Sequence, residues 1–262
     1  MKDKSSAKSR RLWPTSVLLV LLALACVTAA TVAWMTIADR TRVRSMRMEI
    51  TSGANLRFDL DSHDTFEEYV KTLNFRQIAQ RIARERGFDP TEEPLTPVTT
   101  DDCVHFVLED CSVAKTEYYL EFTLHFMATE DMVVHLTSAN GADGSGGTRI
   151  SSDEPNLPKA MRISFTTDQT CVYDPGLGDT VRQTAGYRSF GLPEGGAMTY
   201  HQGNALFSLE KEVDQPVVVR IWLEGTDEAC TDALRRAAYS IQLRFVGTDE
   251  NGNLLEGSGA SG

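Results

Sequence analysis

The sequence lacks the residue groupings that mark the commonest catalytic and metal centres. It has five histidines, but no two of them form the H-E-x-x-H pair of zinc proteases. It contains neither a C-x-x-C pair nor a G-x-S-x-G segment. The glycine-rich segment 141–148 has Gly147 where a phosphate-binding loop has its lysine. We therefore expect a non-enzymatic protein without catalytic residues, metal ligands or a cofactor.

Positive charge is also scarce. The chain has 26 basic and 37 acidic residues. Its first eleven residues carry five of the basic side chains and one of the acidic ones, so the remainder carries 21 and 36, a formal charge of −15. Such an acidic surface repels nucleic acids and anionic lipids. We expect no nucleic-acid partner.

One long segment has no charge at all. Residues 12–38, "LWPTSVLLVLLALACVTAATVAWMTIA", follow the basic tail 1–11 and exceed the roughly 20 residues that span a bilayer. This pattern predicts a signal peptide or a signal-anchor transmembrane helix, with 1–11 in the cytoplasm and the rest outside. Thr31 and Ala33, followed by Trp34, fit a signal-peptidase site. A single-pass membrane protein and a secreted, cleaved protein both remain open.

Four cysteines lie beyond the apolar segment, namely Cys103, Cys111, Cys171 and Cys230. An even number in an exported domain suggests up to two disulfides, and four cysteines allow three connectivities. The run between Cys103 and Cys111 has the pattern of an extended strand, which would hold these two sulfur atoms apart. The disulfide that we favour therefore joins Cys171 and Cys230.

The main structural signal beyond residue 45 is an alternation of apolar and polar residues. It is clearest in 118–126, and it recurs in 46–50, 56–60, 132–136, 161–165, 217–223 and 239–245. A period of two is typical of strands with one face in a core and one in water. Seven such strands joined by polar loops predict an all-β protein with an antiparallel sandwich or barrel. We place this extracellular domain at residues 39–247.

Two segments depart from the alternation. Apolar residues at helical spacing predict an inserted helix at about 65–86, with Asp64 and Glu67 as a capping box and Gly87 as the stop. Acidic residues followed by arginines predict a short helix at about 228–238. Residues 138–158 have the composition of a long loop, and 248–262 that of a flexible tail.

The segment "IWLEGTDEAC", residues 221–230, gathers acids and a thiol where a strand ends. Gly225 permits a turn, and Thr226 or Asp227 can cap the helix expected after it. A catalytic interpretation would need a histidine or lysine nearby, and the local sequence offers none. We interpret the segment as a structural corner between a strand and a helix.

Other polar groups have simple structural explanations. His125 and His135 lie on the polar faces of two consecutive strands and could meet across a sheet, although solvent-facing histidines are the simpler interpretation. Acidic clusters could bind calcium, but exposed turns explain them more simply. These clusters are Asp59, Asp61 and Asp64, and Asp101 with Asp102.

Several segments together resemble the camelysin-like and biofilm-matrix fibre proteins of Gram-positive bacteria. "TVAWMTIADR" is similar to the end of their export segment, and "MRMEITSGANLRFDLDS" to their first hairpin. "LTPVTT", "YYLEFTLHFMATEDMVVHLTS", "MRISF" and "VVVRIWLEGTDEAC" are similar to later parts of these proteins, so the resemblance covers most of 28–247. It implies a jelly-roll-like sandwich at the cell surface or in the extracellular matrix. The family's protease label is not carried over, because no zinc-protease motif is present.

The sequence thus predicts an exported or membrane-tethered β-sandwich that works through protein–protein contacts or self-assembly. Edge strands suit this role, because a strand from a neighbour can extend a sheet. A carbohydrate- or calcium-binding surface module is the alternative, and a metalloprotease-type hydrolase is a more distant one.

Overall fold

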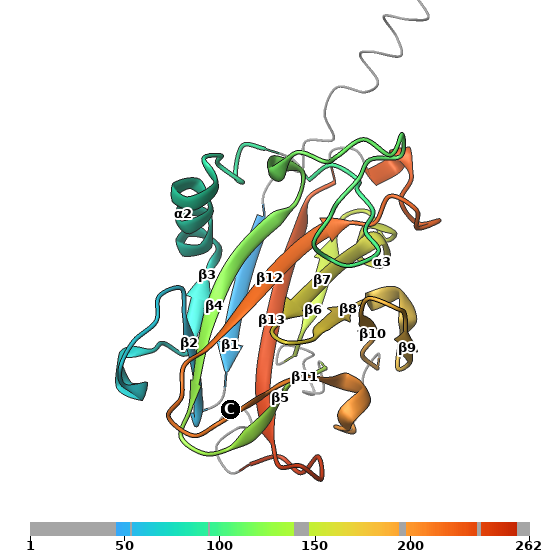
Figure 1. The fold of residues 1–262 in the computed structure, drawn as a ribbon. Helices are drawn as coiled ribbons and strands as arrows, with labels where there is room; N and C mark the ends of the chain where they lie inside the picture. Colours follow the sequence, from blue (N-terminus) through green and yellow to red (C-terminus); the bar gives the residue numbers. More distant parts are fainter. Residues whose placement is uncertain are drawn as a thin grey trace, which may run out of the picture. The chain divides into compact units, whose positions relative to one another are not determined.

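The strands predicted from the alternation form two packed sheets, which we call sheet A and sheet B (Figure 1). The computed structural model describes residues 46–52, 54–93, 95–138, 147–193, 198–234 and 237–255, and of 46–52 the backbone alone. All of them belong to the unit Thr41–Gly262. The predicted all-β sandwich is confirmed for these residues.

Sheet A has six strands and contains the last strand of the chain at its centre. Its order is β11 (Ala205–Leu209), β5 (Met132–Leu136), β13 (Tyr239–Thr248), β1 (Met46–Ser52) and β3 (Thr72–Asn74). A sixth strand, β6 (Arg149–Ser152), pairs with the first half of β13. β6 lies inside the segment 138–158 that was expected to be a loop, of which residues 139–146 fall outside the described ranges.

Sheet B has seven strands. Their order is β2 (Leu56–Asp59), β4 (Leu120–Ala128), β12 (Gln215–Leu223), β7 (Met161–Thr166), β8 (Thr170–Tyr173), β10 (Arg188–Phe190) and β9 (Val181–Gln183). β1 and β2 therefore belong to different sheets, and the expected hairpin of these two strands is wrong.

The expectation of a purely antiparallel sandwich is also wrong. β1 runs parallel to β13, from Met46 opposite Tyr239 to Ser52 opposite Phe245. β10 runs parallel to β8. Both parallel pairs join strands that are separated in sequence by other strands, and such pairs need no tight turn. Alternation in the sequence reports the buried face of a strand, and it carries no information on the direction of the neighbour.

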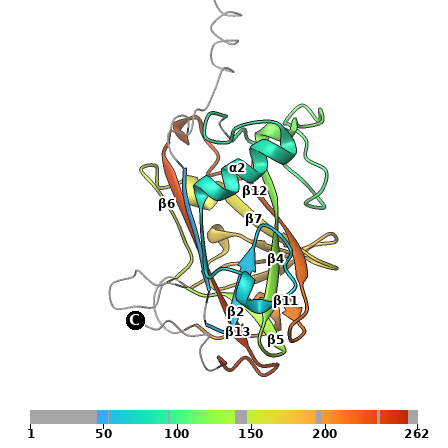
Figure 2. The same ribbon diagram turned by 90° about the vertical axis from the view of Figure 1, so that its left-hand side faces the viewer.

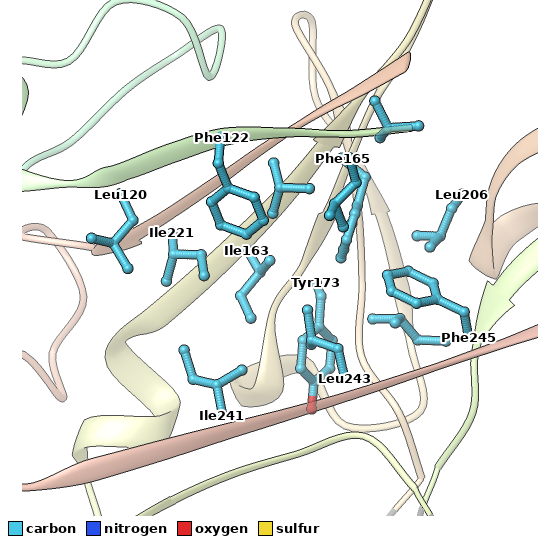
Figure 3. Close-up of a cluster of buried hydrophobic side chains, with 14 of the residues drawn as sticks. Leu120, Phe122, Ile163, Phe165, Tyr173, Leu206, Ile221, Ile241, Leu243 and Phe245 are labelled. Atoms are coloured by element: carbon cyan, nitrogen blue, oxygen red, sulfur yellow. The ribbon is translucent and has the colours of Figure 1, made fainter. Parts of the chain in front are cut away.

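The core lies between the two sheets. Figure 3 shows Phe122, Ile163 and Ile221 of sheet B facing Ile241 and Leu243 of β13. Aromatic rings complete the packing with edge-to-face contacts. Their centroids are 5.1 Å apart for Phe126 and Phe245, 5.7 Å for Phe165 and Phe245, and 5.0 Å for Phe126 and Phe207.

The inserted helix is shorter than expected. α2 spans Phe75–Arg86 and is preceded by a 3-10 turn, η1 (Phe66–Glu68), and by β3. The chain stays extended at Leu73 because this residue pairs with Ile50. Asn74 caps α2 and accepts a hydrogen bond from the backbone N–H of Gln77, at 3.3 Å. Ile78 and Ile82 are fully buried in the core beside the two sheets (Figure 2).

The remaining helical elements are single turns. They are η2 (Thr116–Tyr118), α3 (Leu157–Ala160), η3 (Pro175–Leu177), η4 (Gln202–Asn204) and η5 (Asp232–Leu234). Of the helix predicted at about 228–238, only the turn η5 is present in the described residues, which omit 235 and 236. Beyond β13, Asp249 accepts hydrogen bonds from the N–H groups of Asn251 and Asn253 in a turn, and residues 256–262 of the predicted tail lie outside the described ranges.

A second, smaller cluster covers the outer face of sheet B. Residues 95–119, here called the outer segment, fold back on themselves through the pairs Thr99–Val107 and Val107–Val113. The ring of Phe106 stacks on Tyr119 at 4.2 Å and meets Trp222 of β12 at 5.4 Å. The outer segment therefore covers part of the outer face of sheet B.

Candidate functional site

A polar hollow of about 310 Å³ lies on the outer face of sheet B, beside the outer segment. Its floor consists of outward-facing side chains from four strands, which on β7, β8 and β10 alternate with core residues. These floor residues are Arg162 of β7, Val172 and Asp174 at β8, Ser189 of β10 and Arg182 of β9. Segments 99–101, 184–187 and 224–227 contribute the walls. Pockets of this size lie at the lower end of those that bind small molecules.

The strand register fixes the order of the floor residues. Ser189 pairs with Arg182 on one side and with Val172 on the other. Their side chains therefore form one cross-strand row on the outer face of the sheet. Ser189 is only 6% exposed, and its hydroxyl makes no hydrogen bond with another described residue. The row thus places a guanidinium and an unpaired hydroxyl at the hollow, next to Val172, which the outer cluster buries.

Arg162 organises the inner end of the hollow. Its Nε lies 3.2 Å from Asp174 Oδ2, and its Nη2 lies 2.5 Å from Asp227 Oδ2. Its Nη1 also donates to the carbonyl of Met161, at 2.9 Å. The side chains of Arg162 and Asp174 are 12% and 9% exposed. This ion-pair network is largely removed from water, and the contacts with Asp174, Asp227 and the carbonyls of Lys159 and Met161 engage four of the five N–H groups of Arg162.

Asp174 experiences two opposing effects. Burial raises the pKa of its carboxyl, while the charge of Arg162 and a hydrogen bond from the N–H of Gly176 lower that pKa, and the net change is a rise. The rise shows that desolvation of the carboxylate exceeds the compensation from its partners. Asp174 therefore depends on Arg162 to remain ionised.

The corner 221–230 forms one wall of this hollow. Glu224 accepts hydrogen bonds from Trp222 Nε1, at 3.1 Å, and from the hydroxyl of Thr226, at 2.8 Å. Asp227 pairs with Arg162 rather than capping a helix. The expected strand-to-helix corner is thus corrected to a strand end followed by turns, in which Glu224 binds its sequence neighbours and Asp227 binds Arg162, 65 residues away.

Strand β9 forms the edge of sheet B next to the hollow. The N–H of Gly191 donates to Thr180 O, and the N–H of Thr184 donates to Tyr187 O, both at 3.0 Å. In an antiparallel pair the residues between such positions alternate in direction, so the backbone groups of Val181 and Gln183 point away from β10. All three side chains of β9 are exposed.

Two other sheet edges are covered. Phe58 of β2 exchanges backbone hydrogen bonds with Val70. The carbonyl of Ala205 in β11 accepts from Arg188 Nη2, at 2.5 Å, and from Cys171 Sγ, at 3.4 Å. These contacts use outward backbone groups of β2 and β11. Among the described residues, the outward backbone groups of Val181 and Gln183 in β9 have no hydrogen-bond partner.

The predicted disulfide between Cys171 and Cys230 is absent, and all four cysteines of the described residues are free. Cys171 is buried opposite Phe165, near one end of β7. The N–H of Cys230 donates to Asp227 O, and Asp227 binds Arg162 at the other end of β7. Cys171 thus lies within β8, whereas Cys230 belongs to the turns that follow β12. Burial raises the pKa of both thiols, which disfavours the reactive thiolate.

Cys103 and Cys111 differ sharply in environment. Cys103 is buried in the outer cluster, and burial raises the pKa of its thiol to about 12. Cys111 is exposed in a turn closed by the hydrogen bond from its N–H to Leu108 O. The run 103–111 is therefore reversed by turns rather than extended throughout, because Val107 pairs with strands on both of its sides.

The two histidines that could have met belong to different sheets. His125 of β4 binds Asp214, with Nδ1 2.8 Å from Oδ2. His135 of β5 is buried, with Nδ1 3.0 Å from Asn204 Oδ1. Among the described residues, no group of three or more histidine, cysteine or acidic side chains is arranged to hold a metal ion.

A larger hollow, about 500 Å³, lies near the starts of β5 and β12. Its acidic residues are Asp131, Asp168, Glu210 and Glu250, all on exposed turns or strand ends. It contains neither a buried ion pair nor an unpaired buried hydroxyl of the kind found in the polar hollow. The polar hollow is therefore the better candidate site, despite its smaller size.

No family model, curated protein or solved structure matches this chain. The resemblance to camelysin-like proteins stays a prediction. Segment 12–38, with Thr31, Ala33 and Trp34, lies outside the described residues. None of the helices within the described ranges has the length and hydropathy of a bilayer span.

Sequence reasoning missed the residues that make the hollow. Arg162 could have been recognised as outward-facing from the alternation in "MRISF". Nothing in the sequence links it to Asp174 or Asp227, because the ion pairs join β7 to segments 12 and 65 residues away.

Proposed function

We propose that this protein is exported and acts at the cell surface as a structural, assembly or interaction protein through protein–protein contacts. The uncharged segment 12–38 supports export, either as a membrane anchor or as a cleaved signal. The acidic character of the remaining chain supports a soluble outer domain without nucleic-acid partners.

The observation that carries this proposal is the open edge at β9. The outward N–H and C=O groups of Val181 and Gln183 can pair with an extended segment of a partner. The flanking Thr180 and Thr184 bond to β10 in the same register. The acceptor edge is therefore about five residues long, close to the length of an average strand.

Further parts of the proposal rest on the sequence. They are the camelysin-like relationship, the jelly-roll-like connectivity, the N-terminal hydrophobic helix and the absence of enzymatic activity. N-terminal sequencing of protein isolated from its host distinguishes the two modes of export. A start near Trp34 indicates a released protein, and an intact Met1 indicates an anchored one.

Proline substitution tests the edge directly, because proline removes one N–H and is tolerated where that N–H faces solvent. The variants V181P and Q183P are compared with V181A and Q183A in the full chain on its host cells, after treatment with a short amine-reactive cross-linker. Wild type and the alanine variants should give cross-linked adducts, whereas both proline variants should lose them.

Thermal unfolding of the same variants provides the control. V181P and Q183P should melt within a few degrees of wild type, because they leave the β9–β10 hydrogen bonds intact. Adducts that persist in folded proline variants would place the contact elsewhere and refute the edge proposal. A wild-type protein without any adducts would refute the interaction function itself.

A further inference from the structure

We propose that the polar hollow binds a neutral, polyhydroxylated ligand, of the chemical class of a single saccharide unit. This inference is independent of the β9 edge, because it rests on the hydrogen-bonding groups that line the floor and walls. The question is which ligand can satisfy the polar groups that the fold leaves without partners.

The groups already satisfied define what the hollow cannot do. Arg162 is held by Asp174 and Asp227 and by backbone carbonyls. Its charge is therefore balanced by two carboxylates, which leaves little attraction for an anion. The two carboxylates converge on this guanidinium rather than on empty space, so they do not form a cation cage.

The unsatisfied groups are of both kinds. The guanidinium of Arg182 makes no hydrogen bond or ion pair with another described residue and offers only donors. The exposed Asp101 carboxylate likewise has no partner there and offers only acceptors. Glu224 retains acceptor capacity beyond its bonds to Trp222 and Thr226. Ser189, a residue only 6% exposed, lines the same hollow, and its unpaired hydroxyl can donate or accept.

This mixture selects against simple ions. The hollow is lined by two arginines and four acids, a formal charge of −2, which repels phosphate or sulfate. An ammonium offers donors only, so it would leave Arg182 without an acceptor and face a like charge. A sugar hydroxyl both donates and accepts. Several of them on one ring can therefore serve Arg182, Ser189 and the acids together without desolvating a charge on the ligand.

Two other features fit a ring-shaped ligand. Tyr187 stands in the wall, half-buried against the outer cluster, and burial raises the pKa of its phenol, which keeps the hydroxyl protonated as a donor. Val172 lies beside Ser189 but is only 1% exposed, so the ring of Tyr187 is the apolar surface that the wall offers to a ligand. The C–H faces of a saccharide are apolar and its edge is polar, which matches this combination. The volume of about 310 Å³ suits one small ring rather than a long chain.

The test uses saturation-transfer NMR on the full chain in lipid nanodiscs. The probes are the methyl glycosides of glucose, galactose, mannose and N-acetylglucosamine, each up to 10 mM. We expect transfer to at least one glycoside. S189A and E224Q should each weaken its binding by about tenfold, the usual effect of losing one hydrogen bond to a polar ligand. The matched control is S208A, which removes a serine hydroxyl from the larger hollow.

Several results would overturn the proposal. They are the absence of transfer to every glycoside, equal effects of S189A and S208A, and binding of glycine, butylammonium or sulfate at the hollow in place of a sugar. The variant V181P separates this inference from the proposed function. It should lose protein adducts and keep saccharide binding, so either proposal can fail while the other holds.

Discussion

At the scale of single residues, Arg162 is the most consequential side chain outside the core. Replacing it with methionine leaves the buried carboxylate of Asp174 with only the Gly176 N–H as a partner, at 2.9 Å. Removing one member of a buried ion pair typically costs about 3–5 kcal/mol. We expect R162M to lower the free energy of unfolding by about that amount at pH 7, measured by urea denaturation.

The pH dependence of the R162M effect identifies its cause. Burial already raises the pKa of Asp174, so the uncompensated carboxyl can take up a proton as the pH falls. The destabilisation caused by R162M should therefore shrink between pH 7 and pH 5. Adding D174N to R162M should restore much of the lost stability at pH 7. R182M, at an exposed arginine on the same sheet face, should cost less than about 0.5 kcal/mol. Equal losses for both arginine variants would contradict the ion-pair explanation.

His135 makes folding sensitive to acid. Burial lowers the pKa of its imidazole from 6.5 to about 4, although the hydrogen bonds to Asn204 oppose this change. In the unfolded chain His135 is protonated below pH 6.5, whereas in the folded chain it is protonated only below about pH 4. Stability should fall over this window by about 3 kcal/mol, at 1.36 kcal/mol per pKa unit.

Thermal or urea unfolding of H135Q tests this assignment. The variant should lose most of the slope between pH 6.5 and pH 4. H201Q, which replaces an exposed histidine near the same strand, should keep it. If the fall of stability with pH survives in H135Q, the acid sensitivity belongs to other groups, such as carboxylates whose ion pairs weaken when they are protonated.

At the scale of elements, α2 begins at Phe75, about ten residues later than the sequence predicts. The sequence suggested Asp64 as the cap, whereas Asn74 holds the Gln77 N–H and its own N–H donates to Gln77 Oε1, at 3.0 Å. N74A should lower stability by about 1 kcal/mol. D64A, at an exposed position in the turn before η1, should change it by less than about 0.5 kcal/mol. A larger stability loss for D64A than for N74A would contradict this start of α2 and favour a helix that begins near Asp64.

The strands show what alternation can and cannot predict. All seven segments with a clear period of two became strands, because burying one face of each drives the packing of the sheets. The sequence pattern did not reveal the six strands β3, β6, β8, β9, β10 and β11, since they have three to five residues and show too few alternations to stand out. The helix after Asp64 was predicted too early, because the pairing of Leu73 with Ile50 overrides the helical spacing of the apolar residues before it.

The predictions for single polar residues also depended on whether their partners are near or distant in sequence. Gly225, whose role depends on its neighbours in sequence, lies in a turn as predicted. Residues whose role depends on distant partners were not interpreted correctly, and Asp227 is the clearest example, since its partner is 65 residues away. A single sequence specifies faces and turns locally, while ion pairs such as this one form only after the sheets have packed.

At the scale of the whole molecule, net charge sets the conditions for any self-assembly through β9. Two copies in which residues 12–262 carry a formal charge of −15 repel each other, and the repulsion extends about 30 Å at 0.01 M salt but only about 8 Å at 0.15 M. Strand pairing through backbone groups is itself short-ranged and depends little on salt. We therefore expect cross-linked ladders of wild-type protein in nanodiscs to be weak at 10 mM NaCl and stronger at 150 mM. V181P should stay unlinked at both concentrations. Assembly that weakens as salt is added would point to attraction between opposite charges, and would refute a contact made by the β9 backbone.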